Sequence, residues 1–372
     1  MRNALQKIGA LVIKEFLAIL RDAKSRSVLI FPPIIQMLVF GYAITYDLNH
    51  VPYAIYNEDP SAASRELVDH FHNSPNFREA AVISRHEQIA HLINGKKVLL
   101  VIDIGPQFTR DLTLGKPAPV QVIVDGRNSN TALIALNYVQ TIVTRFNDDW
   151  RADHGRAGPL ARLETRAWFN PNLESRWFIV PGITALLTLV VTMMVTALSV
   201  AREREQGTFD QLLVTPFRPV QILIGKALPG FLIGLAEATL TISVAVFWFH
   251  VPFRGNILTL YTGLSLFLLS AIGVGLMISS LAVTMQQGLL GGFLFMVPAI
   301  ILSGFTTPIE NMPLWIQRLT LINPMRYFIV ILRSTFLEGA GFSDLMHQFW
   351  PMALIGIASM ILAAWLFRHR LY

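Results

Sequence analysis

Long runs of apolar residues dominate the hydrophobic pattern of this chain, and a stretch of mixed polarity, 47–176, separates the first run from the rest. Five runs contain no Asp, Glu, Lys or Arg: 28–46, 177–200, 257–284, 288–305 and 349–367. A sixth run, 227–249, carries a single charge, Glu237, and we extend this element back to residue 221. A helix needs about 20 apolar residues to cross the hydrocarbon core of a bilayer. The pattern therefore predicts six transmembrane helices.

The composition supports a membrane protein. Hydrophobic residues make up 53% of the 372 positions, charged residues make up 15%, and the mean hydropathy is +0.50. Soluble domains carry about 25% charged residues, so a wholly soluble chain is excluded, and the same values exclude a disordered chain. The sequence has no cysteine. This excludes a disulfide scaffold, a cysteine zinc site, an iron–sulfur cluster and a thiol nucleophile.

Basic residues predict the orientation of the spans. Residues 1–27 carry six Lys or Arg against two acids. Apolar side chains recur in this segment at helical spacing: Leu5, Ile8, Val12, Phe16 and Ile19. The segment is predicted to be an amphipathic helix on the membrane surface, with a solvated basic tail as the alternative. If both termini lie inside, the inner segments carry 12 Lys or Arg against 5 acids, and the short outer loops carry four against three. The positive-inside rule therefore predicts cytoplasmic termini.

Residues 47–176 have the alternating pattern of an α/β domain. Short β-branched runs predict strands at 51–57, 80–84, 98–102 and 120–124. Apolar residues at helical spacing predict helices at 61–72, 87–93 and 131–150. Strands that alternate with helices indicate a small α/β domain with its own core. Its place in the chain predicts that it lies on the extracytoplasmic face, between the first and second spans.

No catalytic or metal-binding pattern is evident in this domain. His70 and His72 are two residues apart, which directs them to different faces of a helix. Asp103 and Asp125 each end a predicted strand, where catalytic acids and ordinary turn residues both occur. No nucleophile elbow or zinc-binding helix motif accompanies them. We therefore predict a chain without catalytic activity, metal or bound cofactor, and without affinity for nucleic acid.

The sequence also lacks a recognisable energy source for transport. It contains no P-loop, so ATP hydrolysis is not expected on this chain. Glu237 is the only acid within the predicted spans, and an ionised carboxylate is costly against lipid. It is expected to face a partner helix, a cavity or a bound cation. A structural hydrogen bond and a place on the translocation path both remain open for it. The energy for transport is predicted to come from a separate subunit.

Two segments resemble a known family. The stretch 201–216, AREREQGTFDQLLVTP, followed by Ile224-Gly225-Lys226, is similar to the cytoplasmic coupling loop of ABC-2 type transporter permeases. A second stretch is similar to the segment before the last span of that family, through Ser303-Gly304, Pro308, Met312-Pro313, Trp315 and Asn323-Pro324. The order of parts matches as well, and the large external domain resembles the drug-export branch.

The resemblance implies partners and a coupling site. A second permease copy or a paralogue would pair with this chain in the bilayer, and ABC ATPase subunits would bind ATP and Mg beneath it. A periplasmic adaptor remains open as a further partner. The residues implied in ATPase coupling are Arg202, Glu203, Arg204, Glu205, Gly207, Thr208, Phe209, Leu212 and Leu213. Their pattern combines an apolar face, 208–213, with a charged collar, 202–205, as a knob in a cleft requires. A surface helix resting on lipid headgroups is the alternative.

We therefore predict an α-helical membrane protein of the ABC-2 exporter fold, in a bacterial inner membrane. Its predicted parts are 1–27 interfacial helix, 28–46 first span, 47–176 external domain, 177–200 second span, 201–220 coupling loop, 221–249 third span, 257–284 fourth span, 288–305 fifth span, 306–348 external loop with short partial helices, 349–367 sixth span and 368–372 tail. It would export a lipophilic compound, a drug or an envelope component. The alternatives are a proton-driven transporter that uses Glu237 and a membrane-anchored ligand-binding scaffold.

Overall fold

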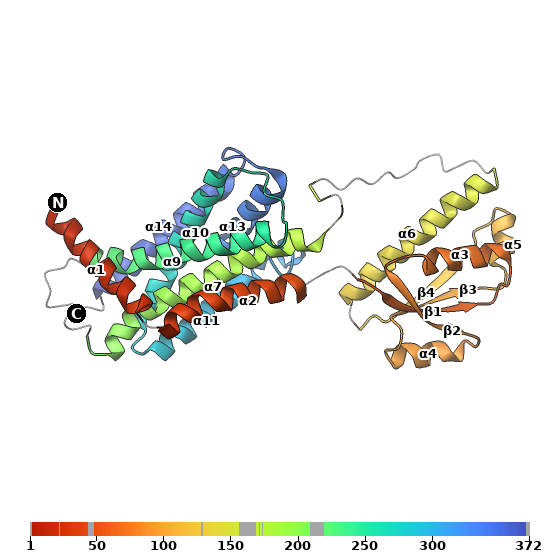
Figure 1. Ribbon diagram of the computed structural model, residues 1–372, viewed down its shortest axis with the longest axis horizontal. Coiled ribbons are helices and arrows are strands. Elements are labelled where there is room, and N and C mark those ends of the chain that lie inside the picture. The colour runs from red at the N-terminus through yellow and green to blue at the C-terminus, as the bar shows by residue number, and fades with distance from the viewer. Residues whose placement is uncertain are drawn as a thin grey trace. The chain divides into compact units, whose positions relative to one another are not determined.

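The computed structural model describes residues 2–21, 23–43, 48–127, 129–155, 169–170, 172, 174–208 and 219–369. The chain divides into two compact units (Figure 1). One unit comprises Met1–Ile44 with Ala167–Tyr372, and the other comprises Thr45–Arg166.

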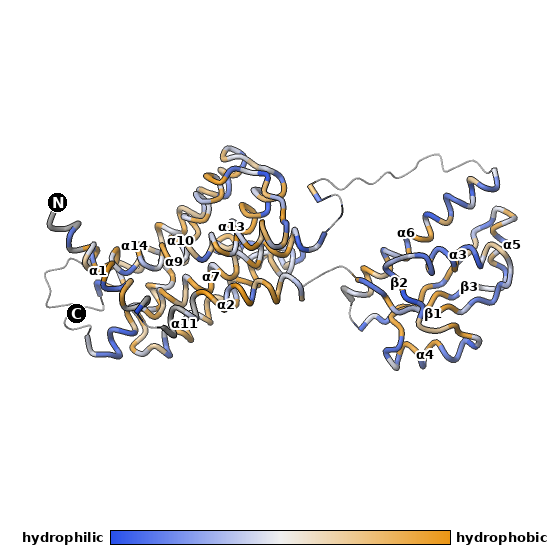
Figure 2. The backbone as a smooth tube through the Cα atoms, in the orientation of Figure 1, coloured by the Kyte–Doolittle hydropathy of each residue, from blue (hydrophilic) through white to orange (hydrophobic). Residues whose placement is uncertain are grey.

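The first unit is a bundle of long helices. They are α1 Arg2–Leu20, α2 Ala23–Ala43, α7 Ser175–Glu205, α9 Pro219–Phe247, α10 Ile257–Leu281, α11 Met285–Ile301 and α14 Met346–His369. Figure 2 shows long hydrophobic stretches along these helices. Within the described residues, α7, α9, α10 and α14 are long and apolar enough to cross a membrane, whereas α2 and α11 contain shorter apolar stretches of 14 and 17 residues, Ile30–Ala43 and Met285–Ile301. Within the described residues, each of the six predicted runs is largely helical, and the count of six spans stays a prediction.

Capping residues set where α10 and α11 begin. Asn256 begins α10, where its side chain accepts a hydrogen bond from the N–H of Leu258 at 2.8 Å. Thr284 begins α11 in the same way and accepts from the N–H of Gln287 at 3.2 Å. Such caps satisfy backbone donors that the first turn of a helix leaves free. The polar residues between two apolar runs therefore fix where one helix stops and the next starts.

Helix α7 lies at the centre of the bundle and packs against α2, α9, α10, α11 and a further helix, α13 Pro324–Arg333. Its contact with α10 is close because Gly275 of α10 leaves room for Thr196 of α7, whose side chain a Cβ at this glycine would overlap. The rings of Phe267 on α10 and Phe328 on α13 stack with centroids 4.3 Å apart. Aromatic stacking and close helix approach together give the bundle a well-packed interior.

The segment before α14 is more structured than a loop with short partial helices. It contains η1 Ile309–Asn311, α12 Leu314–Leu319, η2 Thr320–Ile322, α13 Pro324–Arg333 and η3 Ser334–Glu338. From the sequence, Asn323-Pro324 is expected to end a partial helix over 308–322. The side chain of Asn323 accepts from the N–H of Met325 at 3.1 Å, and Pro324 occupies the first turn, so this pair also begins α13. Most of α13 is buried.

The second unit is an α/β domain with a four-stranded sheet. The strands are β1 Val51–Asn57, β2 Phe77–Ile83, β3 Leu100–Ile104 and β4 Val120–Val124, in the order β2-β1-β3-β4. Strand β1 is parallel to β2 and β3, and β4 is antiparallel to β3. The helices are α3 Ala62–His72, α4 Glu87–Asn94, α5 Phe108–Thr113 and α6 Ser129–Asp153. Helices α3, α5 and α6 cover one face of the sheet, and α4 covers the other.

A buried carboxylate joins the elements of this domain. Asp59 follows β1, and its two carboxylate oxygens accept from the N–H of Ser61 at 2.9 Å and the N–H of Thr109 at 2.7 Å. Burial alone would raise the pKa of Asp59, but the hydrogen bonds from these two residues lower it to about 2. Thr109 lies in α5, a helix that the sequence analysis did not predict. Each predicted strand and helix of this domain is present, with β2 beginning three residues earlier and β3 two residues later than predicted.

Candidate coupling site

The candidate site begins where α7 ends. Gly207 has φ +67°, a left-handed conformation that glycine adopts without strain. Its N–H donates to the carbonyl of Arg204 at 3.1 Å, and the N–H of Thr208 donates to the carbonyl of Glu203 at 3.0 Å. These two bonds form a Schellman motif, which ends a helix and satisfies its last carbonyl groups. The chain therefore leaves α7 sharply at the start of the segment that leads to α9.

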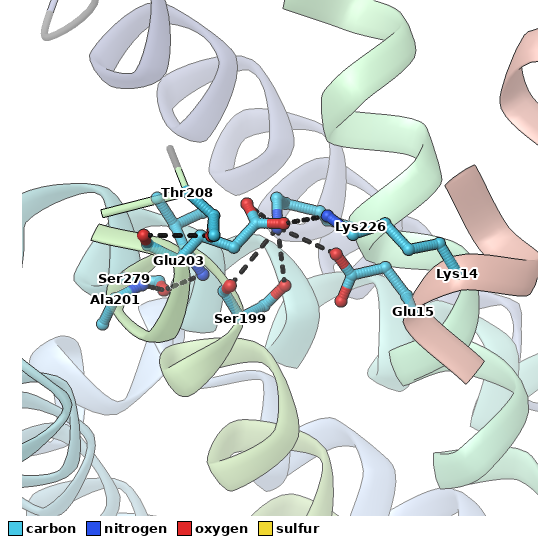
Figure 3. A network of polar contacts seen from close by, with 9 residues as sticks. Lys14, Glu15, Ser199, Ala201, Glu203, Thr208, Lys226 and Ser279 are labelled. Atoms are coloured by element: carbon cyan, nitrogen blue, oxygen red, sulfur yellow. Dashed lines mark hydrogen bonds and ion pairs between the residues drawn. The ribbon is translucent and has the colours of Figure 1, made fainter. Parts of the chain in front are cut away.

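Four charged side chains from three helices meet beside this helix end (Figure 3). Lys226 of α9 lies at the centre, with Nζ 2.7 Å from Oε2 of Glu203 and 3.1 Å from Oε1 of Glu15. The Nζ of Lys14 lies 2.7 Å from Oε1 of Glu203. Lys226 also donates to the backbone carbonyl of Ser199 at 3.3 Å. We call Lys14, Glu15, Glu203 and Lys226 the ion cluster.

Burial differs widely within the ion cluster. The side chain of Lys226 is 1% exposed and that of Glu203 is 8% exposed, whereas that of Lys14 is 53% exposed. Two cations and two carboxylates leave the cluster without net charge. A buried charge is tolerated only when it is paired and hydrogen-bonded. The ion pair between Glu203 and Lys226 therefore holds the end of α7 against the start of α9, on the two sides of the segment 206–218.

Helix α1 joins this contact through a close approach to α9. The side chain of Leu11 lies on Gly225, where a Cβ would overlap it. Leu11, Lys14 and Glu15 follow an i, i+3, i+4 spacing, so they share one face of α1. Four helices contribute to a small apolar cluster in this region: Leu11, Val200, Ile222 and Phe367. The ion cluster and this apolar cluster together attach α1 to the stems of α7 and α9.

The last turn of α7 also contacts the turn between α10 and α11. Arg204 Nη1 donates to the carbonyl of Ser280 at 2.9 Å and to that of Ala282 at 3.2 Å, at the carboxyl end of α10. Glu205 Oε2 accepts from the N–H of Met285 at 2.6 Å, at the amino end of α11. A cation at a helix carboxyl end and an anion at an amino end both complement the helix dipole. The last turn of α7 is thus bonded to α1, α9, α10 and α11.

Glu237 lies in a second polar region, inside the bundle. Its side chain is on α9 and the residue is 5% exposed. Among the described residues, no hydrogen bond of full geometry reaches either carboxyl oxygen, although the hydroxyl of Thr188 on α7 lies close enough to interact with the carboxyl group, and the hydroxyl of Thr192 on α7 also lacks a partner. Gly234 allows α9 to approach α7 closely, since a Cβ there would lie 2.5 Å from Oγ1 of Thr192. Glu237 therefore faces a partner helix rather than lipid.

The comparisons with known proteins agree with this architecture. The family model described as ABC-2 family transporter protein matches residues 26–365. The chain belongs to this family. It is 39% identical to the probable multidrug ABC transporter permease YbhR of Escherichia coli (strain K12), over 98% of this chain and 99% of the relative. It is 35% identical to the probable multidrug ABC transporter permease YbhS (90% and 89%), and 31% identical to the inner membrane transport permease YhhJ (98% and 97%), both of the same strain.

Family membership settles the general role of the chain. It is the permease component of an ABC transporter and a multi-pass membrane protein, and the family implies separate ATPase subunits as partners. The relatives are permease components, which are typically the non-catalytic part of such transporters.

The structure shows the surroundings of the predicted coupling residues in this ABC-2 permease, and their role in coupling stays a prediction. Within the predicted charged collar, Glu203 is buried, because Lys14 and Lys226 on two other helices form ion pairs with it. Arg202 and Arg204 are half-buried, and Glu205 is exposed. Of the predicted apolar face, Thr208 donates from its hydroxyl to the carbonyl of Glu203 at 3.3 Å. Three predicted coupling residues lie outside the described residues: Phe209, Leu212 and Leu213.

The sequence alone did not show which charged side chains of this permease form ion pairs with one another. Lys14 and Glu15 were counted only as charges of a basic surface segment, and Lys226 entered only as part of the family-like motif. One signal was available: Lys226 lies only a few residues inside an otherwise uncharged stretch, where a lone cation needs a partner. That partner could not be named, because Glu15 and Glu203 lie 211 and 23 positions from Lys226 in the sequence.

Proposed function

We propose that this permease is the membrane subunit of an exporter that moves a lipophilic compound, a drug or an envelope component out across a bacterial inner membrane. In this proposal six helices span the membrane, both termini are cytoplasmic and the α/β domain lies outside. ATPase subunits dock on the loop that contains 201–216, and a second permease copy or a paralogue completes the membrane part. The relatives named as multidrug and inner membrane permeases support this substrate class and location.

The ion cluster is the observation that carries the coupling part of the proposal. A loop whose two stems move as one body passes a displacement to both of the helices that it joins. Glu203 lies two residues before α7 ends, and Lys226 lies in the second turn of α9, so the ion pair bridges the two stems. Glu15 and Lys14 add α1 to the same body. A displacement of the loop would therefore move α7, α9 and α1 together.

The route from the stems into the bundle also supports coupling. Helix α7 runs from the loop through the centre of the bundle, where it contacts most of the other helices. Arg204 and Glu205 bond the same end of α7 to the turn between α10 and α11. Packed interiors transmit displacement because they have little free volume.

We place Glu237 on the candidate translocation path. It lies on α9 and faces α7, the two helices whose stems flank the coupling loop. A buried carboxyl group beside the hydroxyl of Thr188 provides oxygen atoms for a cationic or hydrogen-bonding substrate. A joint displacement of α7 and α9 would move this polar region relative to the other helices of the bundle.

Docking on the loop can be tested with two truncations, Phe209→Ala and Leu212→Ala. Loss of an apolar anchor at an interface centre commonly costs about 2 kcal/mol, or about a thirtyfold loss of affinity. We expect less ATPase to copurify with either variant and export to fall, with normal insertion into the membrane. Phe247→Ala is the matched control, because this side chain is 79% exposed at the far end of α9. Full docking and full export by both loop variants would refute the proposal, and export without any ATPase would favour the proton-driven alternative.

A further inference from the structure

The helical unit contains a cavity far from the coupling site. Its volume is about 840 Å³, and it lies where α7 and α14 begin and α11 ends. Phe178 of α7, Val330 of α13 and Trp350 of α14 contribute to its walls. Phe178 and Glu203 are 25 positions apart on α7, which corresponds to about 38 Å along a helix. The cavity therefore lies at the opposite end of the bundle from the ion cluster.

The charged groups that line the cavity are mostly basic. Arg326 and Arg333 of α13 and His347 of α14 line it, together with one acid, Glu310. The guanidinium carbon of Arg333 lies 3.6 Å from the ring centroid of Phe178, which holds this cation beside the cavity. The side chain of Arg326 is held by its bond to the hydroxyl of Thr320. The cavity thus presents two positioned guanidinium groups within walls that are otherwise mainly apolar.

The rim of the cavity faces a hydrocarbon environment. Among its lining residues, Ile322 is 70% exposed, Trp350 is 60% exposed and Leu354 is 59% exposed. Large apolar side chains exposed on a multi-pass membrane protein contact lipid tails. The first turns of α7 and α14 mark the level where the bundle meets water, and tryptophan is enriched at that level. A molecule that enters from the bilayer would bring an apolar part to the rim and a polar part to the arginines.

We propose that this cavity binds one anionic phospholipid, with its phosphate at Arg326 and Arg333 and an acyl chain along Val330, Trp350 and Leu354. The planar donor fork of arginine matches the oxygens of a phosphate group. A zwitterionic lipid would bring a cationic group next to the two arginines, so an anionic headgroup is favoured. The volume accommodates a headgroup and the upper part of the acyl chains, since ligand pockets are commonly about 300–1,000 Å³.

The test measures lipid binding to the purified chain in detergent micelles by native mass spectrometry. The probes are phosphatidylglycerol and phosphatidylcholine with identical acyl chains. Both lipids offer a phosphate to the arginines, but only phosphatidylcholine places a quaternary ammonium beside them, so the wild-type protein is expected to bind phosphatidylglycerol about tenfold more tightly. Arg333→Gln should reduce this preference to about twofold or less. Arg318→Gln is the matched control, because Arg318 is exposed on the neighbouring α12 and does not line the cavity.

A second variant keeps the test decisive if Arg333→Gln does not fold. Val330→Trp places a larger side chain in the cavity without changing charge, and it should weaken the binding of both lipids. Equal binding of the two lipids by the wild-type protein would overturn the proposal, as would unchanged lipid preference in Arg333→Gln or unchanged binding by Val330→Trp. The natural chain has no cysteine, so Leu354→Cys can be cross-linked selectively. A cross-link between two copies through Leu354→Cys would assign the rim to a subunit interface and overturn the lipid site.

Discussion

Two lysine substitutions in the ion cluster remove a contact with the same carboxylate, yet they are expected to lower the free energy of unfolding by very different amounts. Lys226→Met and Lys14→Met each delete an amine that lies 2.7 Å from an oxygen of Glu203. Methionine has nearly the length of lysine, so both changes remove charge while leaving little empty space. The two sites differ in burial, because the side chain of Lys226 is 1% exposed and that of Lys14 is 53% exposed.

The expected losses of stability follow from this difference in burial. Removing one partner of a buried ion pair costs about 3–5 kcal/mol, because a desolvated charge is left uncompensated. Lys226→Met leaves the buried Glu203 close to the partly buried Glu15, with only the exposed Lys14 nearby. An exposed ion pair contributes about 0–1 kcal/mol, since solvent screens it. Lys14→Met leaves Lys226 in place between both carboxylates, so we expect a loss of no more than about 1 kcal/mol.

The assay is the free energy of unfolding of the full-length protein in mixed micelles, with ATPase copurification measured in parallel. Lys226→Met should also weaken ATPase copurification, because the stems of the coupling loop lose their link. Adding Glu203→Gln to Lys226→Met removes the uncompensated carboxylate and should restore at least about 1 kcal/mol. Equal losses for Lys226→Met and Lys14→Met, or no recovery in the double variant, would refute the assignment of the ion cluster as a buried clamp.

Three further predictions concern topology, the α/β domain and the translocation path. An impermeant maleimide should label Asn76→Cys from outside intact inner membranes and Gln206→Cys only after permeabilisation; the reverse pattern would invert the proposed orientation. The pKa of Asp59 is lowered from 3.8 to about 2, so the stability that its carboxylate contributes is complete above about pH 4 and disappears as the pH falls through about 2. In urea unfolding, Asp59→Asn should therefore destabilise the α/β domain by about 1–2 kcal/mol at pH 7 and not at pH 2. Equal stability of the variant and the wild-type protein at pH 7 would contradict this. Glu237→Gln should lower export of a cationic compound about tenfold with ATPase docking intact, and unchanged export would leave this residue a structural role.

The elements of the fold were predictable where one local pattern decided them. Each predicted apolar run is helical because a run without charges can bury its whole surface in lipid or in neighbouring helices. Strands β1 and β4 have their predicted bounds, since turn residues delimit them. The α13 helix was missed because its beginning, Asn323-Pro324, has the sequence of a helix end as well as of a helix cap. Only the packing of Phe328 and its neighbours in the bundle shows which applies.

The candidate site was less predictable because it depends on pairs distant in sequence. Arg202, Glu203 and Arg204 are consecutive in the sequence. A helical pattern alone cannot tell which of these charged side chains faces the bundle. The decisive partners are on α1 and α9, and their approach depends on Gly225, which leaves room for Leu11. A motif therefore located the loop, but the direction of each charged side chain required the packing of three helices.

This packing bears on how a small movement of the loop could reach the bundle. The ion cluster has no net charge, so it can remain buried, and each of its members is held by a partner on another helix. Separating the stems of α7 and α9 would break the ion pair between Lys226 and Glu203. Breaking a buried pair costs about 3–5 kcal/mol. Moving the two stems together breaks none of these contacts. The cheaper response to a push on the loop is thus a joint displacement of α1, α7 and α9, which carries the movement toward Glu237 on the facing sides of α7 and α9.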